Sequence, residues 1–349
     1  LSDTDDTDVT GSELVTNGDF ATSSDWTLNT GWSISGGKLR KTDESNTSAL
    51  QTINTVVGKA YTISVTVDTG ASGGYIFANG SYFGDNMSSA GVYSRTFTAT
   101  STTTQIGITG VPSNGLVADD FSVRLADSDR SVNNNGLQVH GTVTKTAVAT
   151  GADLVGYSNF NTSNYLKQFM NESIGTGDFS FSFWVNPVAS SGSYFHVISI
   201  GTESNGGQSS GNGIVLKLNA TDNSPYFYTG AGGADQGTYD LTNNVLSSGI
   251  WNCVVGGRKN GVFYIYINGK LTKVANTNNF NISNTVLTIG TGLAHNESVT
   301  GTKLALVRIS KTFPSAEQIK KIYNDEKHLF QENAKATLYG SSDAVTALA

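Results

Sequence analysis

Short runs of alternating apolar and polar residues, separated by Gly, Asn and Ser, fill most of the chain. AYTISVTV, GGYIFANG and TTQIGITG occur between residues 60 and 110, and FSFSFWV, FHVISIG and IVLKL between 179 and 218. Alternation with a period of two, interrupted at short intervals by turn residues, is typical of antiparallel strands in a sandwich or barrel. We therefore predict an all-β chain.

A polar, Asn-rich stretch at 127–150, which contains the strand-like run LQVHGTV, separates two strand-rich regions. Such a stretch is typical of a linker that leads into a new domain. The fold class expected is two tandem antiparallel β-sandwiches with one short C-terminal helix. The predicted organisation is a linker (1–12), a first sandwich (13–126), a linker with the first strand of the next unit (127–150), a second sandwich with the helix (151–332), and the lead-in to a further domain (333–349).

The helix is predicted to begin after Pro314. Ser315 can cap it, and Gln318 stands at the position that completes a capping box. Ile319 and Tyr323 then recur at a spacing of three to four residues. This spacing predicts a helix that packs its apolar stripe on a sheet.

Two Asn-Gly pairs, 260–261 and 268–269, bracket the run VFYIYI. Asn-Gly suits the positive φ angles of type I′ hairpin turns. The run is therefore predicted to be a strand with a hairpin at each end. Its alternation places Phe263, Ile265 and Ile267 on one face, and Val262, Tyr264 and Tyr266 on the other.

Charge and composition exclude several classes of partner. The net charge is −7, and the 21 Lys and Arg residues are scattered, so the chain has no basic patch for nucleic acid. No apolar run approaches the roughly 20 residues of a membrane span, so no membrane insertion is expected. Cys253 is the only cysteine, which excludes an intramolecular disulfide, and its apolar strand predicts a buried, inert thiol.

Catalytic signatures are weak, and we predict a protein without enzymatic activity. A sugar-cleaving sandwich needs two carboxylates at a fixed separation, but no Glu-x-Asp-x-Glu strand occurs in the chain. The four histidines are far apart in sequence, and no Gly-x-Ser-x-Gly elbow accompanies them. His196 lies in the middle of a predicted strand, where a sheet residue is favoured over a catalytic base.

Aromatic residues beside Gly and Asn are more suggestive. The apolar face of a sugar ring stacks on Trp or Tyr, while its hydroxyls bond to neighbouring carboxamides and carboxylates. For each residue the alternative is packing in the core. The candidate glycan-binding residues are Trp26, Trp32, Tyr75, Asn79, Tyr82, Tyr194, Tyr226 and Tyr228.

The segment ELVTNGDFATSSDW (13–26), GW at 31–32 and the closing ADDFSVRLA (118–126) resemble the jelly-roll carbohydrate-binding modules found beside glycanases and in phage proteins. The resemblance implies a structural Ca²⁺ between the two ends of the module. Its ligands would be an acidic residue near the start and an Asp of the closing pair. Ala21 stands where the family has a Glu, so Asp19 and Asp120 are the candidate ligands.

The second region is similar to laminin-G and concanavalin A-like lectin domains. The similarity is carried by GTGDFSFSFWVNP (175–187), IWNCVV, FYIYINGKL and KLALVRISKTFPSAEQIKKIYND. It implies binding of glycans or proteins, often with Ca²⁺. Ala305 stands where many members have an Asp, which argues against a Ca²⁺ at that position.

Both modules, the helix and the tail NAKATLYGSSDAVTALA together resemble structural and fibre proteins of marine bacteriophage tails. The resemblance implies a homo-oligomer in the virion tail that is assembled in the bacterial cytoplasm, contacts other tail proteins and adheres to host surface polysaccharide. Two alternatives stay open. One is a purely structural tail module, and the other is a depolymerase whose carboxylates come from separate strands or from a subunit interface.

Overall fold

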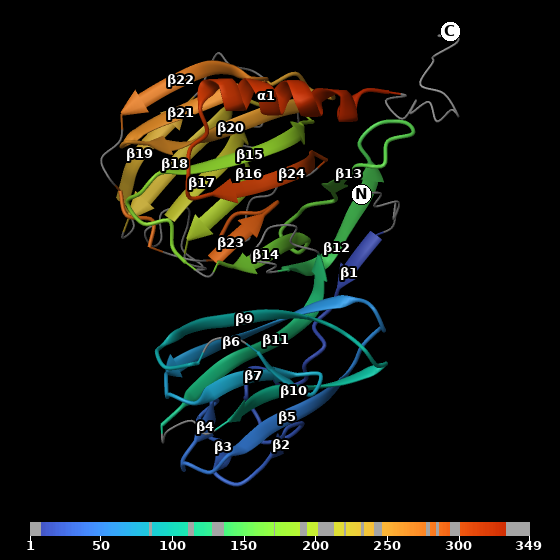
Figure 1. Ribbon diagram of the computed structural model, residues 1–349, viewed down its shortest axis with the longest axis vertical. Helices are drawn as coiled ribbons and strands as arrows, with labels where there is room; N and C mark the ends of the chain where they lie inside the picture. The colour runs from blue at the N-terminus through green and yellow to red at the C-terminus, as the bar shows by residue number, and fades with distance from the viewer. Residues whose placement is uncertain are drawn as a thin grey trace, which may run out of the picture.

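The computed structural model shows two β-sandwiches stacked along the long axis of the molecule (Figure 1). This confirms the predicted all-β fold with one short helix. The structure describes residues 8–83, 86–110, 115–127, 136–170, 172–188, 194–201, 213–219, 221–231, 234–240, 246–276, 280–283, 286–293 and 301–332. The predicted lead-in at 333–349 lies outside these residues.

The N-terminal sandwich consists of two antiparallel sheets. One has the strand order β3–β4–β11–β6–β9, and the other has the order β2–β5–β10–β7–β8. The strands are β2 (Thr27–Leu28), β3 (Trp32–Ile34), β4 (Leu39–Lys41), β5 (Thr47–Asn54), β6 (Ala60–Thr69), β7 (Gly74–Ala78), β8 (Ser81–Phe83), β9 (Gly91–Thr98), β10 (Thr103–Gly110) and β11 (Val117–Asp127).

Strand β6 shows how the alternating pattern builds the core. Ile63 and Val65 are fully buried between the two sheets, as the period-two pattern predicts. The opposite face of β6, which the pattern predicts to be wetter, is also covered. Thr62 and Ser64 are 2% and 5% exposed, because the side chain of Gln138 from the second sandwich lies on them and donates to the Thr62 carbonyl and the Ser64 hydroxyl.

The C-terminal sandwich contains two larger sheets that share β12. One runs β1–β12–β13–β24–β15–β20–β21–β22, and the other runs β12–β14–β23–β16–β17–β18–β19. The strands are β1 (Asp8–Gly11), β12 (Leu137–Ala147), β13 (Val155–Ser158), β14 (Tyr165–Phe169), β15 (Phe179–Asn186), β16 (Tyr194–Gly201), β17 (Gly213–Asn219), β18 (Pro225–Ala231), β19 (Ala234–Asp240), β20 (Asn252–Lys259), β21 (Val262–Ile267), β22 (Lys270–Asn276), β23 (Val286–Ile289) and β24 (Lys303–Ser310).

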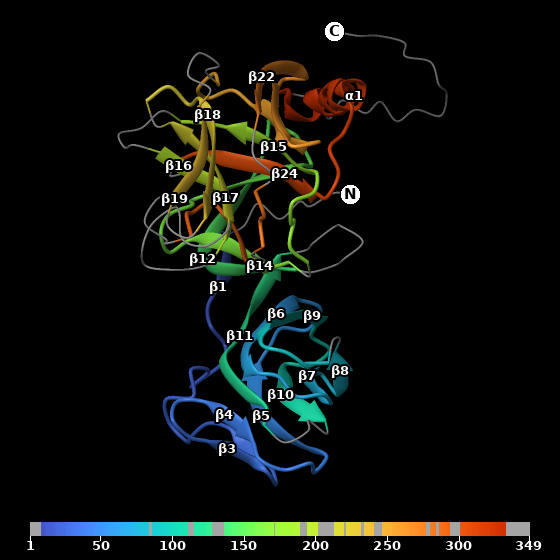
Figure 2. The same ribbon diagram turned by 90° about the vertical axis from the view of Figure 1, so that its left-hand side faces the viewer.

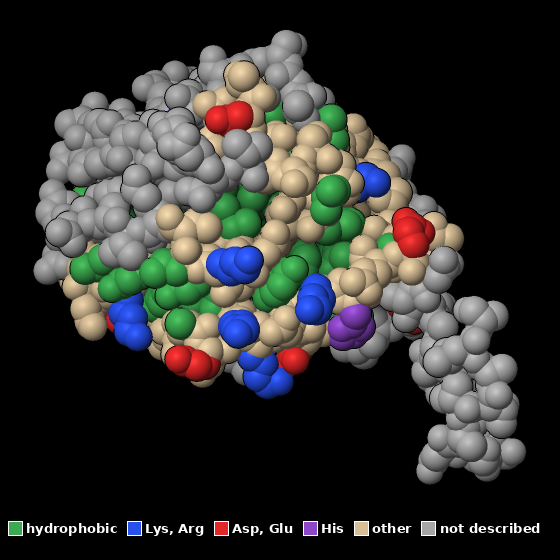
Figure 3. All heavy atoms as spheres, turned by 90° about the horizontal axis from the view of Figure 1, so that it is seen from above, with side chains coloured by type: hydrophobic (Ala, Val, Ile, Leu, Met, Phe, Trp, Pro, Cys, Tyr) green, Lys and Arg blue, Asp and Glu red, His purple; other side chains and the backbone are tan. Residues whose placement is uncertain are grey.

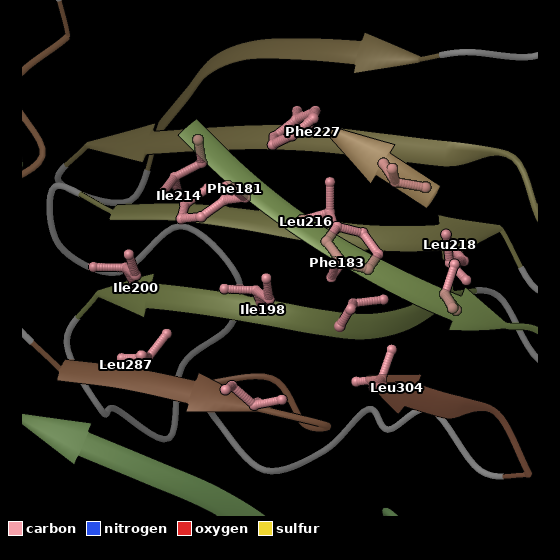
Figure 4. Close-up of a cluster of buried hydrophobic side chains, with 14 of the residues drawn as sticks. Phe181, Phe183, Ile198, Ile200, Ile214, Leu216, Leu218, Phe227, Leu287 and Leu304 are labelled. Atoms are coloured by element: carbon pink, nitrogen blue, oxygen red, sulfur yellow. The ribbon is translucent and has the colours of Figure 1, made fainter. Parts of the chain in front are cut away.

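The core of this sandwich is rich in phenylalanine. Phe181 and Phe183 of β15 point toward the aliphatic side chains of β16 and β17, and Phe227 lies in the same cluster (Figure 4). Burying a Phe side chain contributes about 1.5–3 kcal/mol, so this cluster is a main source of stability. His196 is also buried in β16, in agreement with its predicted place in the sheet.

The outer face of the sheet that contains β15 is covered by α1 (Ala316–Glu326) and the following 3₁₀ helix η1 (Lys327–Phe330) (Figure 1 and Figure 2). The predicted capping box between Ser315 and Gln318 is present. Trp184 stacks on Phe330, with ring centroids 4.2 Å apart, and its indole nitrogen donates to Glu326 at 2.7 Å.

Cys253 lies in the same layer, where burial raises its pKa to about 12. This confirms the predicted burial of the thiol. Seen from above, the described residues present basic side chains among acidic and apolar ones (Figure 3). No helix in the described ranges has the length and apolar character needed to cross a bilayer.

Strand β21 agrees with its predicted hairpins. Asn260 and Gly261 have φ angles of 50° and 73°, and Asn268 and Gly269 have φ angles of 51° and 75°. Positive φ at both central residues is the type I′ geometry. The predicted faces are also correct, since Phe263, Ile265 and Ile267 belong to the core between the sheets, whereas Tyr264 and Tyr266 belong to the layer under the helix.

Hydrogen bonds fix the junction between the sandwiches. Strand β11 of the first sandwich pairs with β12 of the second through Ala126 and Gln138. The predicted N-terminal linker contains β1, which also pairs with β12. Arg124 donates to the carbonyl of Gly11 at 2.7 Å. The connection is therefore built from paired strands rather than from a single extended segment.

Candidate functional site

One row of side chains crosses the exposed face of the β2–β5–β10–β7–β8 sheet. Residues that lie directly opposite each other on paired strands project to the same face. The alternate residues Ile76 and Ile106 are buried in the core, so this row faces outward. We call it the outer row, and it consists, in strand order, of Tyr82, Phe77, Gly107, Leu50 and Thr27.

The outer row begins with aromatic rings. Tyr82 on the edge strand β8 is 64% exposed. Its ring centroid lies 6.3 Å from that of Phe77 and 6.4 Å from that of Tyr75 on the neighbouring strand. Aromatic pairs at this separation stabilise each other by about 0.5–1.5 kcal/mol beyond area burial. The three rings therefore form one partly exposed aromatic surface.

Gly107 leaves the middle of the outer row without a side chain, so the surface dips there. A Cβ atom at this position would lie 2.0 Å from the carbonyl oxygen of Ala49, so only glycine fits. The strand therefore has no side chain between Phe77 on one side and Leu50 on the other.

Polar side chains flank the outer row on both sides. Tyr75 pairs with Thr109, which pairs with Ser48, and the two hydroxyl oxygens of Thr109 and Ser48 are 2.5 Å apart. On the other side, Gln105 pairs with Thr52, and both are exposed. Thr109 is 5% exposed and bound to Ser48, so the most accessible groups of the flanks are the Thr52 hydroxyl and the Gln105 carboxamide, which carry no charge.

Asn79 holds the turn that presents Tyr82. It adopts a φ of 53° ahead of Gly80, and its side-chain oxygen accepts a hydrogen bond from the Thr100 hydroxyl at 2.8 Å. Its amide donates to the Thr98 carbonyl at 3.4 Å. Asn79, which the sequence predicted to bind glycan, therefore orients the β7–β8 hairpin.

Trp26 and Trp32 are core residues, and their prediction as stacking faces was wrong. Trp26 is 8% exposed. Its ring lies 5.2 Å from both Phe20 and Phe121, and its indole nitrogen donates to the Asn17 carbonyl. Trp32 is 6% exposed, beneath the Lys41 ammonium. A ring enclosed in this way cannot stack on a sugar.

The other three predicted tyrosines belong to the second sandwich. Tyr194 lies in β16, and Tyr226 and Tyr228 lie in β18. Their side chains are outside the described part of the structure, so their role as glycan contacts stays a prediction.

The candidate Ca²⁺ ligands Asp19 and Asp120 line one cleft. The two ends of the module meet there, because the Phe121 amide donates to the Gly18 carbonyl at 2.8 Å. The nearby carboxylate of Glu13 is already bound by Ser122 and by the amide of Val123. Among the described residues no group of three or more acidic, His or Cys side chains converges. Asp19 and Asp120 therefore stay predicted ligands, and a Ca²⁺ there would need backbone carbonyls or water to complete its coordination.

The comparisons with known proteins concern mainly the second sandwich. Residues 160–320 match the family profile of the concanavalin A-like lectin/glucanases superfamily. Together with the two large antiparallel sheets, this match shows a concanavalin A-like sandwich. A comparison with curated proteins found no match.

Three solved structures are similar to part of this chain. The binding domain of Paraclostridial Mosquitocidal Protein 1 is 17% identical over 57% of this chain and 49% of its own, with a TM-score of 0.45. The ligand binding domain of botulinum neurotoxin serotype D, in complex with N-acetylneuraminic acid, is 15% identical over 57% and 48%, with a TM-score of 0.44. The enzymatically active domain of tailspike protein 2 from bacteriophage CBA120 is 20% identical over 53% and 29%, with a TM-score of 0.42. The chain spans about half the length of the toxin structures.

Proposed function

We propose that this protein is an adhesin without enzymatic activity that binds neutral glycans through the outer row of its N-terminal sandwich. One observation carries the proposal: partly exposed aromatic rings stand at one end of an outward-facing row that crosses five strands, and uncharged hydrogen-bonding groups border that row. The apolar face of a sugar ring fits on Tyr82 and Phe77. Its hydroxyls then reach Gln105 and Thr52 on one side.

The direction of the outer row suggests how a glycan would lie. Strands in a sheet are about 4.8 Å apart, so five strands place the ends of the row roughly 19 Å from each other. This length suits several linked sugar units. The glycan would therefore run across the strands, from Tyr82 toward Thr27, over the low point at Gly107.

Among the described residues, those of the outer row and of the two flanks named above carry no charge, and this limits the ligand class. An acidic glycan would bury its carboxylate without a cationic partner at these positions, which is costly. Neutral hexoses and N-acetylhexosamines lose no such interaction. We therefore propose neutral glycans rather than sialylated or sulfated ones as the ligands of this face.

The second sandwich supports an adhesive function through its match to a superfamily of lectins and glucanases. Tyr194, Tyr226 and Tyr228 are our proposed contacts there. Because single sites of this open kind bind weakly, symmetric copies in a homo-oligomer would supply avidity through effective concentration.

In the wider setting, we propose that the chain belongs to a phage tail, where it contacts other tail proteins and attaches the virion to host surface polysaccharide. This part of the proposal rests on the resemblance of the sequence to phage tail proteins. Its rival is a module that only joins neighbouring tail proteins. Burial of the outer row against a partner chain would favour that rival.

A glycan array tests the proposal if the full chain is displayed in multivalent form, for example on streptavidin. We expect binding to a subset of neutral glycans and none to their sulfated counterparts. An array with no bound neutral glycan would contradict the proposal. Incubation with host polysaccharide tests the non-enzymatic part, since new reducing ends would identify a depolymerase instead.

A further inference from the structure

A cleft of about 750 Å³ lies between the two sandwiches. Ligand pockets in proteins usually measure about 300–1,000 Å³. Its walls come from β6, β9, β11 and the segment before β2 on one side, and from β12, β14, β16 and β23 on the other. The residues used below are Asp19, Asp120, Ser122, His140, Lys167 and Phe169.

The cleft is fixed by the bonded junction. Gln138 joins the sandwiches through the Thr62 carbonyl and the Ser64 hydroxyl at 3.3 and 3.2 Å. The amide of Gly136 donates to the Thr96 hydroxyl at 2.8 Å, and the Thr62 hydroxyl donates to the Gly136 carbonyl. A cleft held by buried hydrogen bonds is preformed, so a ligand would not have to order it.

A β-bulge aims Asp120 into the cleft. The register between β11 and β6 shifts between Asp119 and Ser122, so that Asp120 and Phe121 together face one residue of β6. Asp120 has a φ of 49°, which is unusual for a residue other than glycine. The bulge turns Phe121 into the core while Asp120 stays exposed. Bulges often serve to re-aim a side chain at a functional site.

Among the described residues, the Asp120 carboxylate has no cationic partner, whereas the carboxylate of Asp119 has one. The Asp119 carboxylate accepts the Lys38 ammonium at 2.6 Å. Asp120 forms no ion pair with any residue that the structure describes. Partial burial and the charge of Asp119 raise its pKa above the usual value. Its oxygens are therefore open to hydrogen-bond donors of a ligand that enters the cleft.

The opposite wall is mixed in character. Lys167 extends over the ring of Phe169, with its nitrogen 4.7 Å from the centroid. His140 stacks on Tyr165, with ring centroids 4.4 Å apart. This wall therefore combines apolar surface with nitrogen-bearing side chains, across the cleft from Asp19 and Asp120.

We propose that this cleft is a second binding site, which takes a short neutral oligosaccharide and uses the Asp120 carboxylate as an acceptor for sugar hydroxyls. The walls carry both carboxylates, Asp19 and Asp120, and a cation, Lys167, and an apolar ligand would strip water from these groups. A polyhydroxylated ligand satisfies them. The site is separate from the outer row and does not depend on it.

Amide chemical shifts of the full ¹⁵N-labelled chain test this site. The probes are neutral tetrasaccharides of glucose, galactose, mannose and N-acetylglucosamine, each titrated to millimolar concentration. We expect at least one of them to shift the amides of Asp19 and Ser122 on one wall and of Gly201 on the other. Asp120→Asn removes the charge yet keeps a side chain that tolerates positive φ, and we expect it to weaken this binding about tenfold.

The matched control is Asp25→Asn. Asp25 is also an exposed carboxylate at positive φ in the same sandwich, and it does not line the cleft. It should leave the shifts of the cleft amides unchanged. Equal weakening by Asp120→Asn and Asp25→Asn, or no shift on both walls with any probe, would overturn the proposal. Loss of glycan binding at the outer row, with the cleft shifts retained, would contradict the proposed function and leave the proposal for the cleft intact.

Discussion

Tyr82 lies directly across from Phe77 on the paired strands β8 and β7, with ring centroids 6.3 Å apart. Strand β8 has only three residues and forms the edge of its sheet. The Asn79-Gly80 turn holds the hairpin, so the Tyr82 ring reaches solvent from a fixed backbone. A rigid support of this kind lowers the entropy that a ring loses when it contacts a ligand.

Removal of divalent metal should leave the protein stable. Among the residues that the structure describes, the carboxylates near the meeting point of Gly18 and Phe121 do not form a group of three or more that could hold a metal ion without other ligands. We therefore expect the same melting temperature in buffer with excess Ca²⁺ and with a chelator. A fall of the melting temperature on chelation, restored by Ca²⁺, would show that the ion expected from the resemblance is bound after all.

Arg258 should be a major stabilising residue of the second sandwich. It is 1% exposed, and its guanidinium donates to the carbonyls of Gly175, Gly177 and Phe280. Arg258→Met leaves these carbonyls without their donor, and we expect a loss of about 2–4 kcal/mol in the free energy of unfolding. Urea denaturation measures it. Lys259→Met, at the exposed next position of β20, should change stability little, and equal effects of the two changes would contradict this role.

Asp43 should support the first sandwich in a pH-dependent way. The buried Lys41 ammonium holds the pKa of Asp43 down, from 3.8 to about 2. A lowered pKa in the folded state contributes stability above the unfolded value, and this contribution is lost as the pH falls through the folded one. Near neutral pH the wild type should therefore have a larger free energy of unfolding than Asp43→Asn. This difference should shrink as the pH falls from 3.8 to about 2. A difference that is constant across this window would argue against the pair.

Gly269 should tolerate substitution less well than Gly80. Both have positive φ, 75° and 79°, so alanine costs roughly 1–2 kcal/mol of backbone strain at either position. At Gly269 the new Cβ would also lie 3.3 Å from Tyr323 on the helix, whereas nothing lies within 4 Å at Gly80. We expect Gly269→Ala to lower the melting temperature more than Gly80→Ala, and Gly269→Val to lower it further. Melting of Gly269→Val at the wild-type temperature would refute the turn.

Local patterns were sufficient for features that depend on neighbours in sequence. The capping box at Ser315 and the turn at Asn268 each need only a few adjacent residues, and both predictions hold. The two faces of β21 follow from alternation alone. Cys253 lies in an apolar strand, and its burial followed from that context.

Features that depend on distant partners could not be predicted in the same way. Trp26 stands among polar residues in the sequence, yet Phe121, almost a hundred residues later, encloses its ring. Thr62 is polar, but Gln138 from the next sandwich covers it. The outer row exists only because Gly107 pairs with strands on both sides, and no single segment reveals that register.

The central claim is that the outer row binds neutral glycans. It is tested most directly by isothermal titration of a neutral glycan identified on the array into the wild type, Tyr82→Phe and the double variant Tyr75→Ala/Tyr82→Ala. Because Tyr82→Phe keeps the ring, its affinity should stay within about threefold of the wild type. The double variant should lose at least about tenfold, since it removes two of the three rings of the aromatic surface and leaves only Phe77. Unchanged affinity in the double variant, with an unchanged melting temperature, would contradict the claim.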